Sequence, residues 1–163
     1  MDKIKEIIQA SIHVKQQILD NEEMLSGIIK VVDVIVYSLE NKGRIYFCGN
    51  GGSAADAQHL AAEFSGRFYT DRKALPAEAL HCNSSYLTAV ANDYSYDVIY
   101  ARLIEGIGNS GDVLIGLSTC CTGRPCCFID LFHQCIRNTF SHFSFLPVTK
   151  IKDLSKFMKP SFE

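Results

Sequence analysis

The clearest structural signal in this chain is the segment at residues 44–64, which reads RIYFCGNGGSAADAQHLAAEF. Residues 44–48 are mostly apolar and predict a short buried strand, and residues 54–64 are rich in Ala and predict a helix. The three glycines of the loop at 49–53 let the backbone approach a ligand closely and adopt positive φ. We expect Ser53 to be the N-cap of a helix whose free N–H groups face an anion, most naturally a phosphate. The alternative is a plain glycine turn in which Ser53 only caps the helix.

Strands and helices alternate over the first 119 residues, which predicts one α/β domain built on a parallel sheet. The other expected elements are helices at residues 4–19 and 22–41, a weak strand at 77–80, helices at 84–91 and 96–107, and a strand at 112–117. The residues expected to face inward from the second helix are Leu25, Ile28, Ile29, Val32 and Ile35. Gly43 is expected to be the C′ residue after that helix.

His59 and Glu63 are four residues apart on the helix predicted after the glycine loop, so they share one helix face. A neutral imidazole and a carboxylate at that spacing can bind a divalent metal together. Alternatively, Glu63 can act as a general base. The third interpretation is a hydrogen-bonded pair on a solvated face without a function.

Two further polar pairs lie where a ligand could bind. Ser118 and Thr119 follow the strand at residues 112–117, and parallel α/β sheets bind ligands beyond the carboxyl ends of their strands. Two hydroxyls there could hold the same phosphate. Asn92 and Asp93 follow a helix, where they are a turn signal first and a polar contribution to a site second.

Gly49, Gly51 and Ala54 also satisfy the spacing G-x-G-x-x-A of dinucleotide-binding loops. Such a site needs an acidic residue at the end of the next strand. Asp71 precedes the candidate strand, and position 81 after it is His. The spacing alone is therefore a weak indication of a dinucleotide site.

Three stretches together closely resemble the phosphoheptose isomerases. They are CGNGGSAADAQHLAAEFSGRF at residues 48–68, ANDY at 91–94 and GDVLIGLST at 111–119. These proteins are sedoheptulose 7-phosphate isomerases with a sugar isomerase (SIS) domain. The resemblance covers residues 1–119.

The resemblance implies a three-layer α/β sandwich of the flavodoxin-like or Rossmann-like type, with a parallel sheet, an N-terminal helical arm and a homotetrameric assembly. It implies isomerisation of sedoheptulose 7-phosphate to D-glycero-D-manno-heptose 7-phosphate for heptose synthesis, through an enediol with Glu63 as the catalytic base. It also implies one zinc ion per subunit, with His59 and Glu63 as half of its ligands. The implied substrate-binding residues are Asn50, Gly51, Gly52, Ser53, Glu63, Asn92, Asp93, Ser118 and Thr119.

The formal net charge is only −2 in 163 residues, so no strong basic field would attract nucleic acid or an anionic membrane. The longest apolar runs are far below the roughly 20 residues that a membrane span needs. The first residues carry no hydrophobic leader pattern. We therefore expect a cytoplasmic protein that binds neither nucleic acid nor a membrane. The partners that the resemblance implies are a sugar phosphate and further copies of the chain.

Residues 120–163 differ in character from the rest and hold five of the seven cysteines and seven of the ten phenylalanines. Where the family continues with S-G-N-S, this chain has CCTG at 120–123, and no R-I-Q-E-x-H motif follows. We interpret residues 120–163 as a divergent or frame-shifted tail. Only His133 and His142 could replace the missing histidine, so we expect weak or absent isomerase activity.

Two other functions stay open. One is a non-catalytic SIS-domain protein that binds the replication initiator or a regulatory sugar phosphate. Glu63 argues for the isomerase, because the isomerase type keeps a carboxylate at that position. The other is a dinucleotide-dependent enzyme, which the missing acidic residue disfavours.

Overall fold

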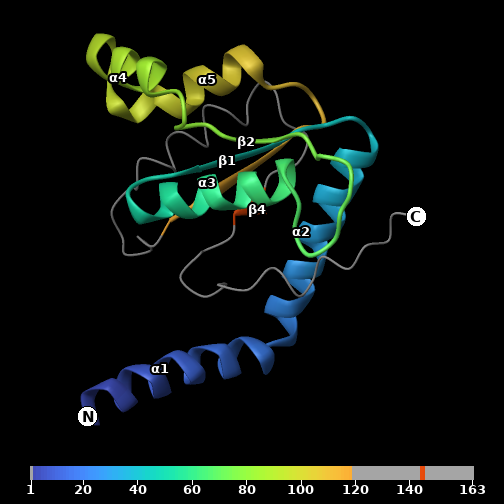
Figure 1. Ribbon diagram of the computed structural model, residues 1–163, viewed down its shortest axis with the longest axis vertical. Helices are drawn as coiled ribbons and strands as arrows, with labels where there is room; N and C mark the ends of the chain where they lie inside the picture. The colour runs from blue at the N-terminus through green and yellow to red at the C-terminus, as the bar shows by residue number, and fades with distance from the viewer. Residues whose placement is uncertain (1, 119–143, 146–163) are drawn as a thin grey trace.

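Strands and helices alternate in the computed structural model, which describes residues 2–118 and 144–145 (Figure 1). The helices are α1 (Asp2–Leu19), α2 (Glu22–Glu40), α3 (Gly52–Ser65), α4 (Ser84–Asp93) and α5 (Ile99–Ile107), with a 3₁₀ turn η1 (Tyr96–Val98) before α5. The strands are β1 (Ile45–Gly49), β2 (Ala77–Ala79), β3 (Val113–Leu117) and β4 (Ser144–Phe145). The expected α/β class is confirmed.

The described strands form one parallel sheet in the order β2-β1-β3-β4. β1 and β3 lie in its middle and are buried over their whole length, which explains why both are continuous apolar runs in the sequence. Their register sets Gly49 opposite Leu117, so the two strands end at the same edge of the sheet. The glycine loop begins at that edge.

Helices cover both faces of the sheet, as the three-layer sandwich predicts (Figure 1). Successive side chains of a strand point to opposite faces. Tyr46 and Cys48 therefore pack in one apolar cluster with α4 and α5, while Ile45 and Phe47 pack in the other with α3 and the partly buried side of α2. The site at the edge thus rests on strands that are fixed from both sides.

A buried carboxylate joins the N-terminal ends of β1 and β3, which lie at the edge of the sheet away from the glycine loop. Asp112 is only 3% exposed. Its two side-chain oxygens accept hydrogen bonds from the backbone N–H groups of Arg44 and Asn109, each at 2.8 Å. These donors offset the cost of burying the charge. The bonds hold the two central strands in register at the edge away from the glycine loop.

The end of α2 shows that the prediction of Gly43 as the C′ residue is wrong. The C-cap is Asn41, and the C′ residue is Lys42, which adopts the left-handed φ of 67°. Gly43 comes one position later and donates its N–H to the carbonyl of Ser38 at 2.8 Å, as in a Schellman motif. Glycine is needed there because a Cβ would lie 2.7 Å from the carbonyl oxygen of Gly111.

α1 is the expected N-terminal helical arm, and Figure 1 shows it extending away from the sheet. None of its residues is buried.

On α2, Ile29 is 57% exposed, so the prediction that it faces inward is wrong. It is turned about 100° around the helix axis from Ile28, which is buried. No helix among residues 2–118 has the length and apolar character to cross a membrane.

β4 adds a strand to the sheet, with Ile115 of β3 paired to Ser144. The other predictions for residues 120–163, including those for His133 and His142, lie outside the described residues. The helix expected at residues 96–107 begins as η1 and becomes α-helical at Ile99.

Candidate functional site

The glycine loop between β1 and α3 corrects the prediction that Ser53 is the N-cap. The N-cap is Gly51, with φ 56° and ψ −123°, a conformation that residues with side chains rarely adopt. The helix therefore begins at Gly52 rather than at Ala54. Ser53 is buried in the first turn, where its N–H donates to the carbonyl of Asn50 at 3.0 Å.

Gly49 lets the loop fold tightly back onto the start of α3. A Cβ at this position would lie 2.5 Å from the carbonyl oxygen of Ser53 and 3.0 Å from the nitrogen of Ala54. A Cβ at Gly52 would meet nothing within 4 Å. Two of the glycines are thus required for different reasons. Gly49 is required because the start of α3 approaches its backbone closely, and Gly51 because of its backbone conformation.

Ser118 lies at the same edge of the sheet as the glycine loop. It follows Leu117, which is paired with Gly49 across β1 and β3, and only 8% of it is exposed. Ligands of parallel sheets bind beyond the carboxyl ends of strands. The predicted loop and Ser118 are therefore placed together, while Thr119 lies outside the described residues. Their role in binding stays a prediction.

Two tyrosines that the sequence analysis did not single out contact the loop. The hydroxyl of Tyr96 donates to Oδ1 of Asn50 at 2.9 Å, and that of Tyr100 donates to the carbonyl of Gly49 at 2.7 Å. Burial raises the pKa of Tyr100, and the nearby Cys48 raises it further. The only sequence signal was their spacing of four residues, which sets both on one helix face.

Asn92 and Asp93 end α4 and are both exposed. Nδ2 of Asn92 donates to Oδ1 of Asp93 at 3.1 Å. Tyr96 follows three residues after Asp93, so its bond to Asn50 brings this segment to the loop. Their part in substrate binding stays a prediction.

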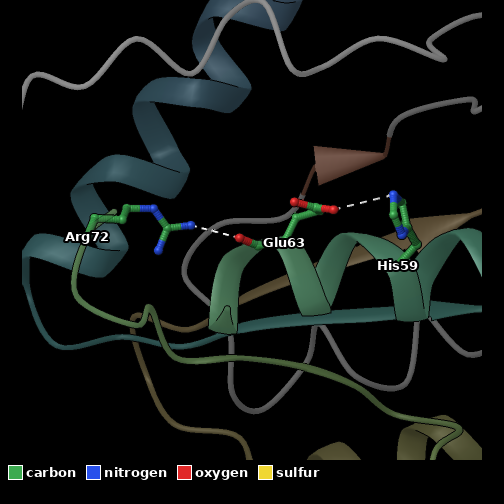
Figure 2. Close-up of polar contacts among 3 residues, drawn as sticks. All are labelled: His59, Glu63 and Arg72. Carbon is green, nitrogen blue, oxygen red and sulfur yellow. Dashed lines mark hydrogen bonds and ion pairs between the residues drawn. The ribbon is translucent and has the colours of Figure 1, made fainter. Parts of the chain in front are cut away.

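His59 and Glu63 lie on one face of α3, as their spacing predicts (Figure 2). Nε2 of His59 is 3.5 Å from Oε1 of Glu63, and the two side chains are 73% and 29% exposed. Figure 2 also shows the guanidinium of Arg72 near the end of α3, where it donates to the backbone carbonyl of Glu63 at 2.8 Å. The same guanidinium donates to the carbonyl of Phe64 at 2.9 Å. Arg72 thus fixes the main chain that carries the carboxylate.

The described residues do not by themselves fit a zinc site. Within residues 2–118 and 144–145, no group of three or more His, Cys, Asp or Glu residues could hold a metal ion. His59 and Glu63 offer two ligands, while protein zinc sites have three or four protein ligands.

His81 occupies the position after β2 where a dinucleotide site would carry an acidic residue. Its Nδ1 is buried and has no hydrogen-bond partner within the described part of the chain. Burial lowers the pKa of His81. A neutral imidazole has one acceptor nitrogen and no negative charge, so it is a poor substitute for a carboxylate that accepts hydrogen bonds from a ribose.

The SIS domain family model matches residues 8–135. The phosphoheptose isomerase of Clostridium acetobutylicum is 48% identical over 112 residues, which are 69% of this chain and 57% of that protein. The phosphoheptose isomerase of Synechocystis is 54% identical over 99 residues, 61% of this chain and 51% of that protein. The chain thus spans little more than half the length of these curated relatives.

Solved structures of phosphoheptose isomerases are similar over a larger part of the chain. The protein of Neisseria gonorrhoeae has a TM-score of 0.77 at 33% identity, over 90% of this chain and 73% of that one. The protein of Francisella tularensis has a TM-score of 0.79 at 28% identity, over 90% and 74%.

Proposed function

The chain belongs to the SIS domain family, among the phosphoheptose isomerases, and we propose that it binds a sugar phosphate and interconverts its ketose and aldose forms. The proposed substrate is sedoheptulose 7-phosphate and the product D-glycero-D-manno-heptose 7-phosphate. One observation carries the proposal: a single helix, α3, has the glycine loop at its N-terminus and Glu63 three turns later.

The loop supplies what a phosphate needs. Gly51 and Gly52 are exposed at the positive end of the α3 dipole, which favours an anion. The amide of Asn50 and the hydroxyl of Ser118 lie at the same edge of the sheet. In the proposal, these groups hold the phosphate and leave the sugar chain to extend along α3.

Glu63 is the proposed base that moves a proton between C1 and C2 through an enediol. Gly52 and Glu63 are eleven positions apart, about 16 Å along the helix. The Glu63 side chain points back toward the N-terminus of the helix, so its carboxylate lies closer to the loop than this rise. A substrate held at its phosphate end must still be extended to reach it, which favours a seven-carbon sugar phosphate over a triose phosphate. His59, 3.5 Å away, orients the carboxylate.

The resemblance further supports a homo-oligomer, one zinc ion and a cytoplasmic location, and all three stay proposals. The self-association has support in α1, where Ile4, Ile7, Ile8 and Ile12 are each more than half exposed. An apolar stripe of this kind is typical of an interaction surface. His59 and Glu63 would be two of the zinc ligands.

The test follows the enediol rather than product alone, because we expect slow turnover from this chain. In ²H₂O, an enzyme that forms the enediol replaces the C1 proton of sedoheptulose 7-phosphate with deuterium, which NMR detects together with any aldose. Glu63→Gln should lower the exchange rate by at least about 10²-fold. The matched control Glu105→Gln changes an exposed glutamate of α5, in the layer on the other face of the sheet, and should leave the rate unchanged.

Equal exchange rates for the wild type and Glu63→Gln would remove Glu63 as the base. A wild-type chain that binds the sugar phosphate by calorimetry but exchanges no proton would instead be a non-catalytic SIS protein.

A further inference from the structure

Two hydroxyls from one turn of the chain contact two consecutive residues of the glycine loop. Tyr96 of η1 and Tyr100 of α5 are four positions apart and bond to Asn50 and Gly49, which are about fifty residues away in sequence. Neither tyrosine takes part in the proton transfer proposed above. Their bonds are therefore unexplained by the catalytic chemistry.

Tyr100 anchors the loop from its buried side. It is 4% exposed, and its hydroxyl reaches the carbonyl of Gly49, the last residue of β1. Burial, with the nearby Cys48 and Tyr96, holds its pKa above the ordinary value of a tyrosine. The hydroxyl therefore stays protonated and remains a donor at neutral pH.

Tyr96 controls the orientation of the Asn50 side chain. An asparagine amide has one acceptor oxygen and a nitrogen that only donates. Tyr96 occupies the oxygen at 2.9 Å, and within the described residues the Nδ2 group has no acceptor of its own. The amide is thus held with its donor group left for a ligand.

We propose that Tyr96 is a positioning residue that, by holding Oδ1 of Asn50, directs Nδ2 of Asn50 toward an oxygen of the bound sugar phosphate. This inference rests on the proposed function and deepens it. Without the tyrosine hydroxyl, the amide can rotate and present its oxygen, which repels an anionic ligand. Tyr96 follows three residues after Asp93, so the same bond joins the two segments expected to contact the substrate.

A double-mutant cycle in the full chain tests the inference. Calorimetry would give the Kd of sedoheptulose 7-phosphate and of inorganic phosphate for the wild type, Tyr96→Phe, Asn50→Ala and the double variant. Tyr96→Phe should weaken binding about tenfold, the effect of one misdirected hydrogen bond to a charged group. In the Asn50→Ala background the same change should alter Kd less than twofold, because Tyr96 acts through Asn50.

Tyr86→Phe is the matched control. It likewise removes one tyrosine hydroxyl, but this hydroxyl comes from α4 and donates to the backbone carbonyl of Ile99 at 3.0 Å rather than to Asn50. Its Kd should equal the wild-type value. An additive effect of Tyr96→Phe and Asn50→Ala would mean that Tyr96 only supports the fold, and this result or an unchanged Kd would overturn the inference.

The two proposals can fail separately. A coupled cycle in a protein that exchanges no C1 proton would sustain the positioning role and reject the isomerase. A wild-type chain that binds neither ligand would reject both.

Discussion

His81 shows how one buried side-chain atom can make stability depend on pH. Its Nδ1 is buried without a partner in the described part of the chain, at the end of β2 and next to the buried Leu80. A proton on this atom would add a charge and an unsatisfied donor in a place with little water. Burial accordingly lowers the pKa of His81 below 6.5, its ordinary value.

The sign of the pH dependence follows from this direction. Between the lowered pKa of the folded state and 6.5, the unfolded chain binds more protons, so the free energy of unfolding falls as the pH drops below 6.5. His81→Gln should lose less stability than the wild type between pH 7.5 and pH 5.5 in urea unfolding. The difference between the free energies of unfolding of the two proteins at pH 7.5 gives the effect of the substitution on packing alone. A parallel loss in both proteins would show that His81 does not couple to folding.

At the scale of elements, the junction of β1 and α3 depends on backbone conformation rather than on a capping side chain. Gly51 adopts a conformation that other residues rarely reach, and no side chain caps the helix. Strain of this kind in a residue with a Cβ costs about 1–3 kcal/mol. The neighbouring Gly52 has no such constraint and an open space around it.

This contrast gives a paired prediction. Gly51→Ala should lower the free energy of unfolding by about 1–3 kcal/mol and weaken phosphate binding. Gly52→Ala should be neutral or stabilise the protein by up to about 1 kcal/mol, because alanine restricts the unfolded chain. Denaturant unfolding of both variants measures the difference. Equal stabilities would show that the positive φ of Gly51 is not needed.

At the scale of the whole molecule, α1 is the helix whose apolar side the described chain leaves exposed. Its isoleucines at positions 4, 7, 8 and 12 lie on one side of a helix in which no residue is buried. The rest of the described chain packs around the sheet in two apolar clusters to which α1 contributes nothing. A second copy of the chain is the partner that the proposed homo-oligomer would supply.

Ile8→Lys should therefore dissociate the assembly or weaken it by at least tenfold, since it sets a charge within the apolar stripe. Light scattering after size exclusion would measure the molar mass over a range of concentrations. Glu6→Gln is the control, because it changes the net charge by the same amount on the other side of α1. A monomeric wild type, or an unchanged mass for Ile8→Lys, would contradict the proposal.

Local patterns were sufficient to predict much of this protein. The apolar run before the glycines, the alanine-rich helix after them and the His59–Glu63 spacing depend on residues close in sequence, and their structure follows from short-range sterics and helix periodicity. The alternation of such segments was enough to predict a parallel sheet in an α/β layer fold, and the family resemblance added the helices on both faces. The family resemblance rested on the same local stretches.

Other features were decided by contacts between distant parts of the chain. The pairing of Gly49 with Leu117, the bond from Tyr96 to Asn50 and the carboxylate of Asp112 join residues far apart in sequence. Such contacts depend on how the strands pair and how the helices dock on the sheet, which no local pattern records. The start of α3 was misplaced for a different, local reason, because the positive φ of Gly51 sets the cap at that residue, two positions before Ser53.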